Sequence, residues 1–156
     1  MRRKDREMPE EFAWELADRC QWMVLSMTDP QGDPYCVPLS MAREERTFYF
    51  HCARDGEKLL CLKARPQVCI SCVGEVRPVP EEYALDYESA IFRGTAREVT
   101  EEKERLHALE LICRRYAPSN PEGFDGAVER AFSRTAIWKV EVDSAAGKRR
   151  PGPSGK

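Results

Sequence analysis

The stretch Pro34–Pro66, PYCVPLSMAREERTFYFHCARDGEKLLCLKARP, decides the fold. From Tyr35 to Met41, larger apolar side chains alternate with Cys36, Pro38 and Ser40, which is the period of a half-buried strand. The polar run Arg43–Arg46 predicts a turn, and the aromatic run Thr47–Cys52 predicts the returning strand of a hairpin.

A helix is predicted directly after this hairpin, over residues 57–64. Asp55-Gly56 breaks the strand, and Leu59, Leu60 and Leu62 then recur at helical spacing. Pro66 ends the helix, because the residue before a proline disfavours helical angles.

The corner where this helix begins could hold a phosphate. A helix start has unpaired N–H groups and a partial positive charge, and Lys58 in the first turn adds a full charge. His51 and Cys52 end the strand that leads into the corner. Pro38 removes one donor from its strand and predicts an edge strand, along which a planar polar ligand could bond to the backbone of Val37–Ser40. The spacing alone also fits an ordinary hairpin followed by a helix.

Three motifs resemble one known family in their order and spacing. They are Arg2–Glu7 (RRKDRE), Gly32–Ser40 (GDPYCVPLS) and Phe50–Leu59 (FHCARDGEKL). Together they resemble the flavin-binding split-barrel family, which is the pyridoxamine 5′-phosphate oxidase-like superfamily, and within it the nitroimidazole-reductase branch. The resemblance runs from Arg2 to about Arg149.

This resemblance implies a mainly β fold: a six-stranded antiparallel split barrel with flanking helices. It also implies a homodimer that binds one flavin mononucleotide (FMN) per subunit at the interface. By position, Lys58 would meet the phosphate, His51 and Cys52 would lie near the ribityl chain and ring edge, and Ser89 and Trp138 would reach the ring from the partner subunit. The isoalloxazine ring would lie along Val37, Pro38, Leu39 and Ser40.

The implied activity is NAD(P)H-dependent reduction of a nitro-aromatic or similar small acceptor. Glu57 stands where the vitamin-forming oxidases place a second basic residue, so pyridoxamine phosphate oxidation is disfavoured. His51 is the candidate catalytic proton donor, since an unperturbed histidine titrates near neutrality, and a hydrogen bond that orders the flavin is the alternative role. Two rival functions are a flavin-binding protein without turnover and a haem-binding split barrel with His51 or His107 as axial ligand.

The composition predicts one domain, with the barrel over residues 1–146 and a basic, disordered tail over 147–156. The chain has 156 residues, 42% hydrophobic and 33% charged, with a net charge of −2, which argues against nucleic acid as a main partner. No apolar run is long enough to span a membrane, and the charged start is unlike a signal peptide, so we expect a cytoplasmic protein.

The seven cysteines are predicted to be reduced thiols within strands and helices. Cys69 and Cys72 have the spacing of a metal or redox pair. Residues three apart in a strand point to opposite faces, however, so the two thiols should not meet. We therefore expect no metal site.

The remaining pattern predicts a sheet with helices at its ends. Gly94, inside one strand, is expected to mark a bulge or barrel corner. The expected strands are 22–28, 67–76, 87–99 and 135–142, and the expected helices are 9–20, 101–116 and 125–132.

Overall fold

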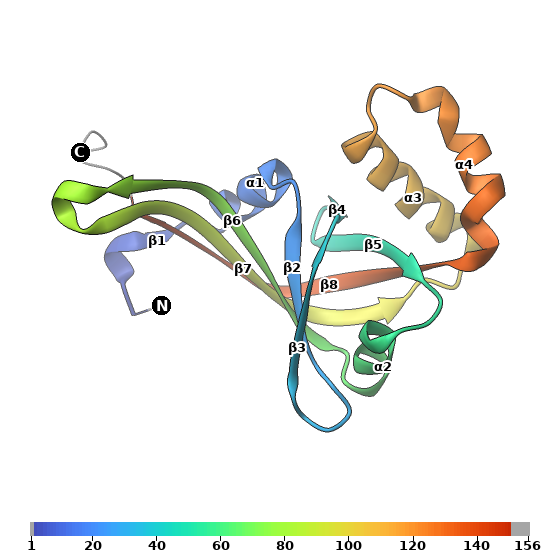
Figure 1. The fold of residues 1–156 in the computed structure, drawn as a ribbon, viewed down its shortest axis with the longest axis horizontal. Coiled ribbons are helices and arrows are strands. Elements are labelled where there is room, and N and C mark those ends of the chain that lie inside the picture. The colour runs from blue at the N-terminus through green and yellow to red at the C-terminus, as the bar shows by residue number, and fades with distance from the viewer. Residues whose placement is uncertain (1, 151–156) are drawn as a thin grey trace.

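A computed structural model describes residues 2–150 of the chain. It is built on one antiparallel sheet in the order β3-β2-β6-β7-β8-β5-β4, with β1 paired to β8 (Figure 1). The mainly β antiparallel class is confirmed, but the sheet has eight strands rather than six. The strands are β1 (Glu7–Met8), β2 (Met23–Thr28), β3 (Pro34–Leu39), β4 (Ala42–Glu44), β5 (Thr47–Ala53), β6 (Gln67–Val79), β7 (Ala84–Glu98) and β8 (Thr135–Arg150). The helices are α1 (Glu10–Arg19), α2 (Glu57–Ala64), α3 (Glu102–Tyr116) and α4 (Phe124–Ala131).

The predicted hairpin of the central stretch divides into two strand pairs. β3 ends at Leu39 and pairs with β2, whereas the partner of β5 within this stretch is the separate short strand β4. The turn is tighter than the predicted Arg43–Arg46, because Arg43 and Glu44 still belong to β4 and Glu45 takes a left-handed conformation with φ 50°. The helix bounds are confirmed, since α2 spans Glu57–Ala64.

The main core lies between the sheet and helices α1 and α2. Ala136, Trp138, Val140 and Val142 of β8 enter it on one face, as the alternation predicts. The opposite face of β8 carries Ile137 into a smaller core beneath α3. β8 therefore separates the barrel interior from the layer that holds α3.

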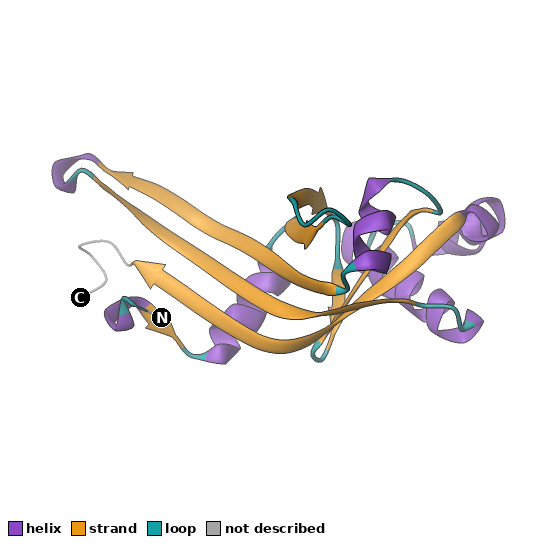
Figure 2. Cartoon of the chain, turned by 90° about the horizontal axis from the view of Figure 1, so that it is seen from below, coloured by secondary structure: helices purple, strands orange, loops and turns teal. Residues whose placement is uncertain are grey.

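The β6–β7 hairpin and the end of β8 extend beyond the barrel as an arm (Figures 1 and 2). α1 covers one face of the arm, where Cys72 and Ala90 are paired and fully buried. On the other face Val73 is 60% exposed, so the apolar run of residues 68–73 is fully buried on one face only. We call this second surface the arm face. Its exposed apolar residues are Val73, Val76, Leu85 and Ile91.

The arm also corrects the expected end of the domain. The last strand continues past Val142 to Arg150, so residues 147–150 are paired strand rather than tail. Their partners are Glu7 and Met8 on one side and residues 87–90 of β7 on the other. The rest of the expected tail, 151–156, lies outside the described residues.

Candidate functional site

β3 lies at the edge of the sheet, as Pro38 predicts. Among the described residues it pairs with β2 alone, so its outer edge is open along Val37–Leu39. The side chains of Val37 and Leu39 pack partly against the main core, while Pro38 and the following Ser40 are exposed. An open backbone edge offers N–H and C=O groups at fixed spacing, which suits the polar edge of a planar heterocycle.

The start of α2 is a second open set of donors. Gly56 has φ +114°, which only glycine adopts readily, and the space where a Cβ would stand is empty to 4 Å. Within the described chain no side chain caps α2 at Gly56. An anion could therefore approach the first N–H groups of this helix closely.

Lys58 stands at that helix start without a carboxylate partner in residues 2–150. Its ammonium nitrogen lies 6.0 Å from the centre of the Phe50 ring, in a cation–π contact. α2 packs against β2 and β3, so the helix that carries this unpaired charge contacts the edge strand.

His51 and Cys52 lie on opposite faces of β5. Cys52 packs at the margin of the main core, and burial raises the pKa of its thiol. His51 pairs with Ile137 across the ladder and its side chain reaches solvent. Desolvation by neighbouring atoms, and then the charge of Lys58, lower the pKa of His51, so its imidazole is mostly neutral at pH 7. Two adjacent strand residues cannot both face the same side of one ligand.

Ser89 and Trp138 occupy very different places. Ser89 is half-buried on the arm face, opposite Val73 on one side and Lys148 on the other. Trp138 is 3% exposed and pairs with Phe50 inside the barrel. Its strand is an inner one, because β8 lies between β7 and β5. Its indole Nε1 is buried without a hydrogen-bond partner in the described part of the chain.

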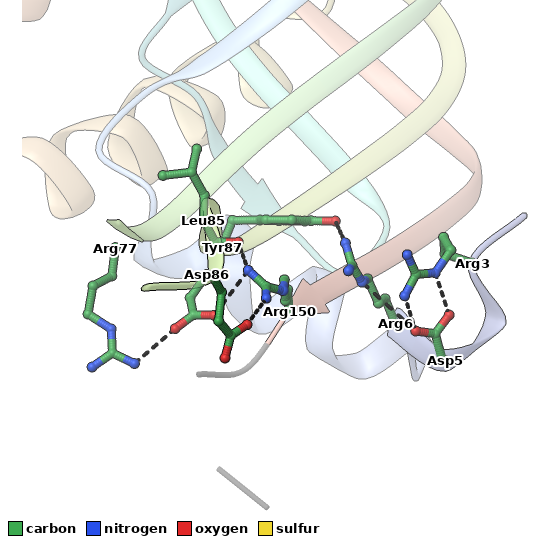
Figure 3. Close-up of polar contacts among 9 residues, drawn as sticks. Arg3, Asp5, Arg6, Arg77, Leu85, Asp86, Tyr87 and Arg150 are labelled. Carbon is green, nitrogen blue, oxygen red and sulfur yellow. Dashed lines mark hydrogen bonds and ion pairs between the residues drawn. The ribbon is translucent and has the colours of Figure 1, made fainter. Parts of the chain in front are cut away.

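The N-terminal motif Arg2–Glu7 makes specific contacts with the arm. Arg6 donates from Nη1 to the Tyr87 hydroxyl at 3.4 Å, and Arg3 bonds to Asp5 at 2.8 Å (Figure 3). Arg150, the last described residue, lies beside them and donates to the carbonyl of Leu85 at 3.2 Å. The motif thus packs against β7 and β8 of the arm, which sequence spacing could not reveal because Tyr87 lies about eighty residues away.

The remaining candidates show no metal chemistry. His107 Nε2 lies 2.9 Å from a carboxylate oxygen of Glu44, at hydrogen-bond distance on the surface. All seven cysteines are free thiols, and Cys69 and Cys72 alternate in burial along β6 as predicted. Within residues 2–150 we find no cluster of three or more metal-ligating side chains, and no helix with the length and apolarity to cross a membrane.

An open-edged antiparallel barrel with flanking helices and a projecting arm defines the class of split-barrel proteins, and the comparisons with known proteins agree. The sequence profile of the pyridoxamine 5′-phosphate oxidase family matches residues 9–149. The chain belongs to this family. Among curated proteins, no significant match is found.

Solved structures with the same fold cover most of the chain. A proposed 5-nitroimidazole antibiotic resistance protein from Bacteroides thetaiotaomicron is 27% identical over 92% of this chain and 86% of its own, with a TM-score of 0.78. A conserved hypothetical protein from Mycobacterium tuberculosis is 13% identical over 98% of both chains, with a TM-score of 0.80. An FAD- and haem-binding protein from Mycobacterium smegmatis is 17% identical over 94% of this chain and 74% of its own, also at 0.80. The last two show likeness of fold alone.

Proposed function

We propose that this protein is an FMN-binding flavoprotein that reduces a nitro-aromatic or similar small acceptor with electrons from NAD(P)H. The single observation that carries the proposal is the Lys58 corner: an unpaired cation beside an uncapped helix start, on a helix that packs against the open-edged strand β3. A phosphate at the first feature and a flat hydrogen-bonding ring at the second are the two ends of FMN. The likeness to the B. thetaiotaomicron protein supports the choice of acceptor.

The residues of this chain fit the cofactor at both ends. Gly56 leaves room for a phosphate oxygen to approach the backbone, and Lys58 would neutralise its charge. Val37–Ser40 would hold the ring through their backbone. Bound flavin supplies the chemistry by taking hydride from a reduced nicotinamide and passing electrons to the acceptor. His51 would donate a proton or order the ring by a hydrogen bond, and the lowered pKa favours the second role.

A second copy of the chain would complete the flavin-binding groove, which would lie between the two subunits. The arm face presents Val73, Val76, Leu85 and Ile91 to solvent at 36–60% exposure, on a sheet whose other face is covered by α1. Several exposed apolar side chains on one sheet face are typical of a protein interface. Ser89 lies on the same face and would reach the partner's flavin. Trp138 fits this role less well, because it is buried within its own barrel.

The seven free thiols suit the reducing cytoplasm, which we keep as the proposed location.

Two rival functions differ from the proposed one, either in the ligand that is bound or in the absence of turnover. A haem protein would use His51 as axial ligand, since His107 is engaged by Glu44. A flavin carrier would share every binding residue and oxidise no NAD(P)H. The absorption spectrum of the purified protein separates haem from flavin, and an NAD(P)H oxidation assay separates the carrier from the reductase.

Substitution of Lys58 tests the phosphate site directly. A charge-assisted hydrogen bond contributes on the order of 1.5–3 kcal/mol, so Lys58→Ala should weaken FMN binding about tenfold or more. Riboflavin, which lacks the phosphate, should bind with nearly unchanged affinity. Both dissociation constants can be measured by flavin fluorescence on the apoprotein.

Lys63→Ala is the matched control, because Lys63 is an exposed lysine in the last turn of the same helix. It should leave both affinities unchanged. Equal losses for FMN and riboflavin in Lys58→Ala would remove the phosphate from this corner.

A further inference from the structure

A hollow of about 440 Å³ lies where the ends of α1 and α3 meet the start of β2. We call it the Trp22 hollow; Trp22, Ser40, Arg115 and Tyr116 are among its lining residues. Its size falls within the range of small-molecule sites and exceeds what a single aromatic ring needs. Sequence reasoning did not find it, because its lining residues come from three separate segments of the chain.

Among the residues that line this hollow, Trp22 is unusual in its exposure. Its side chain is 66% exposed, whereas Trp138 is 3% exposed and Trp14 stacks on Phe48 with ring centres 5.9 Å apart. An indole that its own fold leaves uncovered, at the lip of a hollow, offers a flat face on which another aromatic ring can stack.

Arg115 provides a fixed positive charge in the same hollow. Its Nη2 donates to the carbonyl of Ala17 at 2.7 Å and also to the carbonyl of Cys20, which anchors the guanidinium at the end of α1. Within residues 2–150 it has no carboxylate partner. The other charged residues that line the hollow have partners of opposite charge: Asp18 accepts a hydrogen bond from Arg43, and Arg19 donates one to Glu88. The hollow therefore combines a stacking surface with one positioned, uncompensated guanidinium.

Ser40 connects this hollow to the proposed flavin edge. It follows β3 directly and ends the stretch Val37–Ser40, so a ring along that edge would have the Trp22 hollow at its end. Tyr116 holds the junction in place, because its hydroxyl donates to the carbonyl of Met41 at 2.9 Å.

We propose that the Trp22 hollow binds the electron acceptor as a single-ring nitro-aromatic compound. The ring stacks on Trp22 and the nitro oxygens point to Arg115, next to the Ser40 end of the flavin edge. The inference rests on the proposed function for its biological meaning, but the binding site itself consists of residues that do not touch the proposed phosphate corner.

Calorimetric titration with 4-nitrobenzyl alcohol tests the stacking. Trp22→Ala should weaken its binding to the FMN-loaded protein about tenfold, while Trp22→Phe, which keeps a ring, should stay within about threefold. The FMN affinity should not change. Tyr83→Ala removes an aromatic side chain that is 99% exposed outside the hollow, and should bind like the unmodified protein. Unchanged binding by Trp22→Ala would overturn the proposal.

Benzyl alcohol, which lacks the nitro group, tests the role of Arg115. The unmodified protein should prefer the nitro compound, and Arg115→Gln should bring the two affinities close to equality. If Arg115→Gln does not fold, the Trp22 variants decide. A Trp22→Ala protein whose mass falls to a monomer would also overturn the proposal, since it would assign Trp22 to a subunit interface.

Titration of the flavin-free protein separates this inference from the proposed function. If the protein binds no flavin but binds the nitro compound in a Trp22-dependent way, the hollow stands and the flavin function fails. If it binds flavin but not the nitro compound, the proposed acceptor site is wrong and the flavin function stands.

Discussion

At the scale of single residues, His51 shows how one strand sets the chemistry available to a side chain. It sits one position before Cys52, yet the two side chains face opposite sides of β5. The charge of Lys58 and desolvation both disfavour the imidazolium. A group that is mostly neutral at pH 7 orders a ligand readily but supplies a proton only from its small protonated fraction.

His51→Gln distinguishes the two roles. General-acid catalysis typically contributes about 10²–10⁴-fold, so loss of a true donor should slow electron transfer to the acceptor by a large factor. If His51 only orders the flavin, glutamine should replace the hydrogen bond and the rate should fall by a small factor. The measurement is the acceptor half-reaction on pre-reduced, flavin-saturated protein.

The pH dependence of the same half-reaction also distinguishes the two roles of His51. The pKa of His51 is lowered, so a rate that depends on the imidazolium should be highest in acid and fall as pH rises through a value below 6.5. The His51→Gln profile should lack this limb. An unchanged rate and profile in the variant would end the catalytic role.

At the scale of elements, the close pairing of β7 with β8 depends on Gly94. The pairing register shifts between Arg93 and Gly94, which confirms the predicted bulge. A Cβ on Gly94 would lie 2.2 Å from the carbonyl oxygen of Glu141. That oxygen belongs to the backbone of β8 and cannot turn away as a side chain could.

Gly94→Ala should therefore destabilise the fold by about 2 kcal/mol or more, because overpacking forces the backbone of two central strands apart. The midpoint of urea unfolding measures the loss. Gly126→Ala in α4 is the control: its nearest neighbour is the flexible end of Arg130 at 3.1 Å, and alanine favours a helix by roughly 1 kcal/mol over glycine. A Gly94→Ala protein as stable as the Gly126→Ala control would contradict the close contact.

At the scale of the whole molecule, the arm is the feature that one subunit does not explain. The N-terminal motif contacts the arm through Arg6 and Tyr87 (Figure 3), and the exposed apolar residues of the arm face lie on one side of it. Exposed valine, leucine and isoleucine on one sheet face are costly in water, and a second copy would bury them.

We therefore expect light scattering to give about twice the chain mass of 17.9 kDa. Val73→Glu on the arm face should shift the protein to monomer and weaken flavin binding. For the oligomeric state, Leu60→Glu is a matched control, since Leu60 is exposed to a similar degree (62% against 60%) but lies on α2, and this variant should stay dimeric. If the unmodified protein is a monomer that still binds flavin, the flavin site is not formed between two subunits.

The sequence determined the local elements well. Asp55-Gly56, the spaced leucines and Pro66 define α2 to the residue, because glycine conformation and proline sterics act within a few residues. Pro38 indicated an edge strand and Gly94 a bulge for the same reason. The motif order also sufficed to identify the family.

Only the tertiary structure decided which of these elements meet. The pairing of β5 with β8, the inner place of β8 in the sheet, the burial of Trp138 and the link from Arg6 to Tyr87 all join residues far apart in the chain or depend on strand order. Alternation along a strand gives its two faces but not which face is covered. The arm face remained open because α1 packs on the other side, and that choice depends on contacts across the whole sheet.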